Sequence, residues 1–177
     1  MSRILTYHCQ VPEAEQNDDV DLIVAAWQRE RPDLDVQPLS VLSRVTRLAR
    51  HLDGARQEAF ASHDLDSWEF DVLAALRRAG APYALSPGQL SSQTLVTSGT
   101  MTTRVDRLAE RGMVRRLPDP HDRRGVRVEL TDQGKAAVDG ALTDLLKREQ
   151  VLLDSLEPGD REQLADLLRA LMGQFPA

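Results

Sequence analysis

Arginines are concentrated in one stretch of this 177-residue chain, where their chemistry suits a polyanionic partner. Between Thr97 and Arg127 there are eight arginines and four acidic residues, a formal charge of +4 in a chain whose total is −6. The remaining residues therefore carry −10. A basic segment on an acidic body is the usual electrostatic signature of a nucleic-acid reader. A solvated, salt-bridged helix face is the alternative explanation of the same charges.

Short polar side chains accompany the first of these arginines. They are Ser98, Thr100, Thr102 and Thr103, followed directly by Arg104. At the N-terminal end of a helix, such groups can enter the roughly 12 Å wide major groove and bind phosphates or base edges. Ordinary capping and solvation are the alternatives, and for Ser98 capping explains the residue as well as contact with DNA does.

The next elements are predicted from capping and periodicity. A capping box at 86–89, with proline at the first helical position, predicts a short helix. A second helix runs from Ser98 to a C-terminal glycine at 112, so the pair predicts a helix-turn-helix. Strand-like pieces at 113–117 and 126–130 then predict a β-hairpin. Its polar tip holds two adjacent arginines.

Longer apolar helices flank this segment. Periodicity predicts helices over about 20–31 and 39–60 before it, with a break at Pro38. A further helix is opened by a capping box at Asp66, and two more cover 132–156 and the residues from Pro158 onward. The expected fold class is mainly α with a small β-hairpin. The terminal helices are more apolar than a module of this size needs.

This order of elements resembles the MarR family of bacterial winged-helix regulators. The resemblance is carried by DPHDRRGVRVELTDQG at 119–134 and by LVTSGTMTTRVDRLAERGMVRR at 95–116, and it covers roughly residues 20–173. The pattern of DP, DRR-G and LT-x-x-G behind a helix-turn-helix is specific. It implies a transcriptional regulator, most simply a repressor released by a ligand, rather than an enzyme. No nucleophile elbow or phosphate-binding glycine loop points to catalysis.

The resemblance also implies a domain plan. A flexible tail at 1–17 would precede one domain at 18–177, with the winged helix-turn-helix at about 62–131 and dimerisation helices at about 20–60 and 132–173. Homodimers of the family read a pseudo-palindromic operator in double-stranded DNA.

In the hairpin, or wing, the second arginine of the family's motif enters the minor groove and the preceding aspartate braces it. That implies DNA contacts for Arg124 and its neighbour Arg123, with Asp122 as the brace. An exposed turn with a local ion pair is the alternative.

A finer resemblance concerns the ligand. The urate-responsive subgroup carries a tryptophan, an aspartate and two arginines at the positions of Trp27, Asp71, Arg104 and Arg116. A stacking indole, forked guanidinium donors and a carboxylate would suit urate or a similar small anion. Tricarboxylate or phenolic ligands remain open. So do structural roles, with Trp27 in the core and Asp71 paired to an arginine.

Other chemistry is less well supported. A redox regulator acting through Cys9 is an alternative, although only Tyr7 and His8 lie nearby and a reactive thiolate needs an electropositive setting. The four histidines lack metal-ligand spacing, so no metal and no cofactor are expected. No secretory signal or membrane-spanning stretch is evident, and we expect a cytoplasmic protein.

Overall fold

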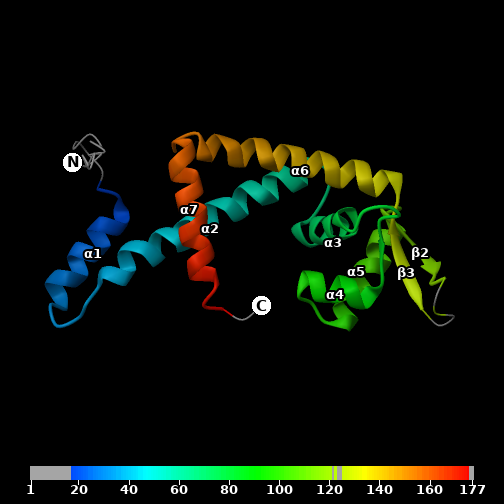
Figure 1. Ribbon diagram of the computed structural model, residues 1–177, viewed down its shortest axis with the longest axis horizontal. Helices are drawn as coiled ribbons and strands as arrows, with labels where there is room; N and C mark the ends of the chain where they lie inside the picture. Colours follow the sequence, from blue (N-terminus) through cyan, green and yellow to red (C-terminus); the bar gives the residue numbers. More distant parts are fainter. Residues whose placement is uncertain (1–16, 121, 123–124, 176–177) are drawn as a thin grey trace, which may run out of the picture. The chain divides into compact units, whose positions relative to one another are not determined.

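The computed structural model describes residues 17–120, 122 and 125–175 (Figure 1). Contacts group the chain into two units, Met1–His51 and Leu52–Ala177. The elements are α1 (Asp19–Glu30), α2 (Gln37–Ala61), α3 (Ser67–Arg78), β1 (Ala84–Leu85), α4 (Pro87–Thr94), α5 (Ser98–Glu110), β2 (Val114–Pro118), β3 (Val126–Leu130), α6 (Asp132–Leu153) and α7 (Pro158–Met172). This mainly helical architecture with a small hairpin confirms the expected fold class.

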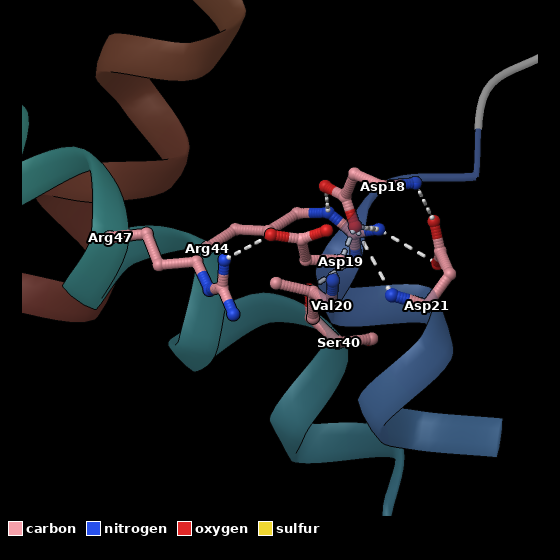
Figure 2. Close-up of polar contacts among 7 residues, drawn as sticks. All are labelled: Asp18, Asp19, Val20, Asp21, Ser40, Arg44 and Arg47. Carbon is pink, nitrogen blue, oxygen red and sulfur yellow. Dashed lines mark hydrogen bonds and ion pairs between the residues drawn. The ribbon is translucent and has the colours of Figure 1, made fainter. Parts of the chain in front are cut away.

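In the first unit, an ionic cluster fixes the start of α1 to α2. Asp18 caps α1, and its carboxylate accepts hydrogen bonds from backbone N–H groups of the first turn. Arg44 of α2 donates to both carboxylate oxygens of Asp18 at 2.9 Å and lies 2.7 Å from Asp21. Arg47 pairs with Asp19 at 3.1 Å, and Figure 2 shows both arginines reaching this end of α1. Two arginines thus pair with three carboxylates at the helix N-terminus.

The second unit is built around α3. Five consecutive residues of this helix are buried, from Val72 to Leu76, and the helix packs against α4, α6 and β3. Phe60, at the end of α2, stacks on Phe70 with ring centroids 4.0 Å apart. Apolar residues of α4, α5 and the sheet complete one continuous core. This core is what holds the helix-turn-helix in place.

The three strands form an antiparallel sheet in the order β1-β3-β2. Val114 pairs with Leu130 and Pro118 with Val126, which confirms the predicted hairpin. β1 was not predicted, because two residues are too few to show alternation. It pairs with β3 through Ala84, whose carbonyl also accepts a hydrogen bond from Arg127 at 2.6 Å. In Figure 1 the hairpin lies beside α5.

The predicted helices and caps are confirmed, with one correction. The break expected at Pro38 does not occur, because α2 begins at Gln37 and Pro38 lies in its first turn, where a missing N–H costs nothing. The glycine of the LT-x-x-G motif has a packing role. A Cβ at Gly134 would come well within 3.0 Å of the carbonyl oxygen of Met113, so only glycine lets α6 start against β2.

The terminal helices carry apolar faces that the chain's own core does not cover. On α7, Leu167 is 58% and Met172 66% exposed, and on α6 Leu146 is 54% exposed. Leucine and valine side chains on α1 and α2 are exposed as well. None of the helices in the described residues is both long and apolar enough to span a membrane. The assignment of these helices to dimerisation, and the domain plan as a whole, stay predictions; residues 1–16 lie outside the described part.

Candidate nucleic-acid interface

Helix α5 presents a polar face because its apolar residues are used by the core. Met101, Val105 and Leu108 recur at helical spacing and are at most 1% exposed. The N-cap is Thr97, whose hydroxyl accepts a hydrogen bond from the N–H of Thr100 at 3.3 Å. The opposite face is therefore turned outward at the first turn of the helix.

The hydroxyl residues predicted to contact DNA lie on this outward face. Ser98, Thr100, Thr102 and Thr103 are all exposed. Thr102 donates to the carbonyl of Ser98 at 3.0 Å, and Thr103 donates to that of Gly99 at 3.3 Å. These local bonds fix the hydroxyl rotamers and leave oxygen lone pairs available as acceptors. The capping role considered for Ser98 falls to Thr97.

The arginines from α5 to β2 divide into two groups by their partners. Arg111, Arg115 and Arg116 each bind a carboxylate, at 2.5 Å from Glu69, 2.6 Å from Glu129 and 2.7 Å from Asp106 respectively. The hydrogen bond that Arg111 donates to Glu69, which is 3% exposed, raises the pKa of Arg111. The first pair joins the end of α5 to α3, the second joins β2 to β3, and the third joins β2 to α5.

Arg104 and Arg107 form the other group. Within the described part of the chain, neither guanidinium pairs with a carboxylate. Both line an open hollow of about 360 Å³ together with Thr100, Thr103 and Trp68. The Cζ atom of Arg104 lies 5.5 Å from the ring centroid of Trp68. Two positive charges on the polar face of α5 are thus left for an external anion.

Next to the tip of the wing, the backbone makes a close contact at Gly125. The N–H of Asp119 donates to the carbonyl of Gly125 at 2.9 Å, and the N–H of Gly125 donates to that of Asp122 at 2.9 Å. A Cβ at Gly125 would lie 2.9 Å from the Cβ of Asp119, so the turn requires glycine. Asp122 is exposed, and its bracing role remains a prediction. Arg123 and Arg124 lie outside the described residues.

The four predicted ligand residues are not gathered in one described hollow. Arg104 lines the hollow beside Trp68, but Asp71 and Arg116 do not. Asp71 is exposed on α3, and Arg116 is bound to Asp106 of α5. Trp27 belongs to the other unit, on α1, and is 49% exposed, so it is not plain core.

The segment from α3 to the wing matches the family that its motifs resemble. The sequence model of the MarR family matches residues 63–125, from the α2–α3 turn to the wing. The HTH-type transcriptional regulator PecS of Dickeya dadantii is 40% identical over 156 residues, which cover 88% of this chain and 92% of PecS. The chain belongs to the MarR family. It is a DNA-binding transcriptional regulator and not an enzyme.

Solved structures of this family agree with the fold. A mutant of MarR from E. coli, complexed with operator DNA, is 29% identical with a TM-score of 0.62, covering 78% of this chain and 99% of MarR. BpsR of Bordetella bronchiseptica is also 29% identical, with a TM-score of 0.55 over 72% of this chain and 98% of BpsR; its structure concerns regulation of DNA binding by 6-hydroxynicotinic acid. Family members thus include one seen on DNA and one controlled by a small acid.

Sequence reasoning missed two features of this MarR-type unit. One is Trp68, which faces Arg104; its place in a capping box suggested only a helix start. The other is His63, whose Nε2 lies 2.8 Å from a carboxylate oxygen of Asp144. Its ring packs on Gly140, where a Cβ would come within 2.6 Å of it. The spacing between residues 63 and 144 gave no signal, since such contacts depend on how α6 folds back.

Proposed function

We propose that this regulator is a homodimer that binds a pseudo-palindromic operator through α5 and the wing and is released by a small anionic ligand, which makes it a repressor. The observation that carries the DNA site is the pair Arg104 and Arg107, which lack carboxylate partners on the exposed face of α5 in the described residues. Guanidinium groups without a carboxylate partner can bind phosphate or guanine. A regulator of this kind would act in the cytoplasm, where bacterial DNA lies.

The homodimer is supported by the uncovered apolar faces. Leu164, Leu167, Leu168 and Leu171 follow helical spacing on α7, and each is at least 37% exposed. Exposed apolar stripes on terminal helices are typical of surfaces that pack against a partner. Two-fold symmetry would then present two α5 helices to half-sites about one DNA turn apart.

The ligand is proposed to be urate or a similar small anion that uses Trp27, Asp71, Arg104 and Arg116. Support comes from BpsR, a relative controlled by an acid with a flat heteroaromatic ring. We expect the ligand to act on Arg116, because the ion pair between Arg116 and Asp106 joins β2 to α5. An anion that captured Arg116 would break that ion pair and shift α5, lowering DNA affinity by favouring a second state.

Anisotropy of a labelled duplex from upstream of the protein's own gene tests both parts. We expect tight binding by the wild type and release by urate at micromolar to low millimolar concentration. Trp27→Ala should bind the duplex as the wild type does but no longer respond to urate. A variant that is still released would show that Trp27 takes no part. Release by tricarboxylates, phenolics or an oxidant instead of urate would favour the alternative ligands or the Cys9 mechanism; Cys9 lies outside the described residues.

The wing's contribution is tested in the same assay. Arg124→Ala should weaken duplex binding while the protein stays dimeric, because the variant has no guanidinium to place in the minor groove. Arg123→Ala should have a smaller effect. Unchanged affinity in both variants would remove the wing from the DNA site and leave α5 alone.

A further inference from the structure

The ring of Trp68 lies beneath the Arg104 guanidinium at the proposed DNA site. The role inferred for Trp68 therefore rests on the proposed function. Trp68 is the second residue of α3, is half-buried and packs against the core of the second unit. Its indole N–H donates to a carboxylate oxygen of Asp66 at 3.3 Å. The ring is therefore held by the core on one side and by the start of α3 on the other.

Arg104 lies against this ring, with its Cζ atom 5.5 Å from the centroid. No hydrogen bond joins its guanidinium to another side chain in the described residues, in contrast to Arg111, Arg115 and Arg116. A carboxylate would hold a guanidinium by occupying its N–H donors. An aromatic face attracts the cation through the ring quadrupole and leaves those donors at the edge available.

We propose that Trp68 is a positioning residue that holds the Arg104 guanidinium in place for DNA. The contact restricts a long, rotamer-rich side chain before binding, which reduces the entropy that DNA binding would otherwise cost. Arg107 lines the same hollow and makes no such contact with the ring, so it serves as the matched control.

A double-mutant cycle on duplex affinity tests this role. Trp68→Leu should weaken binding about two- to five-fold, the range of an exposed cation–π contact, and Trp68→Phe should retain part of the affinity. In an Arg104→Ala background, Trp68→Leu should have no further effect, whereas in an Arg107→Ala background its effect should persist unchanged. An equal loss of affinity in both backgrounds would mean that Trp68 acts on folding alone and would overturn the proposal, as would no loss in any background.

Fluorescence provides a readout that does not depend on DNA. The chain has two tryptophans, so in a Trp27→Phe variant Trp68 is the one indole that emits. Arg104→Ala should change its emission and Arg107→Ala should not; identical spectra for both would show that Arg104 does not lie on the ring. If the wild type bound no duplex while the Arg104→Ala shift appeared, the proposed function would fail and the contact would stand. Tight duplex binding without coupling would retain the function and discard the positioning role.

Discussion

At the scale of single residues, part of the family signature has a structural role within this chain. In the LT-x-x-G signature, Thr131 caps α6 through a 3.1 Å hydrogen bond from the N–H of Gly134, and that glycine makes room for β2. Arg115 and Arg116 belong to the arginine-rich stretch between Thr97 and Arg127, yet both bind acidic residues of this chain. A family signature therefore mixes residues that build the wing with residues available to read DNA.

Gly134→Ala should destabilise the protein strongly. Its Cβ would lie well within 3.0 Å of the Met113 carbonyl oxygen, and a backbone atom cannot move aside as a side chain can. We expect a loss of about 3 kcal/mol or more in urea unfolding, at the upper end of overpacking effects. The matched control is Gly54→Ala, a helical position with nothing within 4 Å, which should gain about 0.4–1 kcal/mol. Similar results for the two variants would contradict the close approach of α6 to β2.

The His63–Asp144 pair should make stability depend on acid pH. Hydrogen bonds from His63 and then Lys147 hold the pKa of Asp144 below its ordinary value. A carboxyl with a lowered folded-state pKa stabilises the protein above its unfolded pKa of about 3.9, and this contribution disappears as the pH falls through the folded value. The difference in unfolding free energy between wild type and Asp144→Asn, from urea unfolding at a series of pH values, should therefore be at its full size above about pH 5 and shrink below about pH 4. A difference independent of pH would mean that the pair does not stabilise the ionised form of Asp144.

At the scale of elements, the sequence predicted most of the fold because local signals were strong. The capping boxes at Asp66 and Ser86 and the alternation in β3 each mark an element from within it. What could not be predicted depends on distant residues: β1 exists because Ala84 meets Glu129. The contact of Arg104 with Trp68 likewise requires α3 and α5 to lie next to each other. The ionic cluster on α1 joins residues more than 20 positions apart, so no helical period reveals it.

The ionic cluster between α1 and α2 should control how firmly α1 is held against α2. Arg44 binds two aspartates at the helix N-terminus, where it also offsets their mutual repulsion. Arg44→Ala should make the backbone amides of α1 exchange hydrogen several-fold faster, as read by mass spectrometry. Arg29→Ala is the control, because Arg29 pairs with its exposed neighbour Glu30 on α1 itself. Equal exchange in the two variants would show that the cluster does not hold α1.

At the scale of the whole molecule, the proposed regulator requires two chains acting together. The proposed dimer would bury leucines of α7 that one chain leaves exposed. Leu167→Asp should weaken dimerisation by roughly 100-fold or more, because an unpaired charge in an apolar interface costs several kcal/mol. Glu162→Gln on the same helix should leave the dimer intact. Analytical ultracentrifugation distinguishes the two, and a dimeric Leu167→Asp protein would exclude α7 from the interface.

Above all, we propose that α5 reads DNA through Arg104 and Arg107, which have no carboxylate partner in the described part of the chain. The most direct test measures the salt dependence of duplex anisotropy for the wild type and for the double variant Arg104→Ala/Arg107→Ala. The wild type should bind tightly, with log K falling linearly as log salt rises, and each phosphate that the variant no longer neutralises should reduce that slope by about 0.9. A folded double variant with the wild-type affinity and slope would contradict the claim.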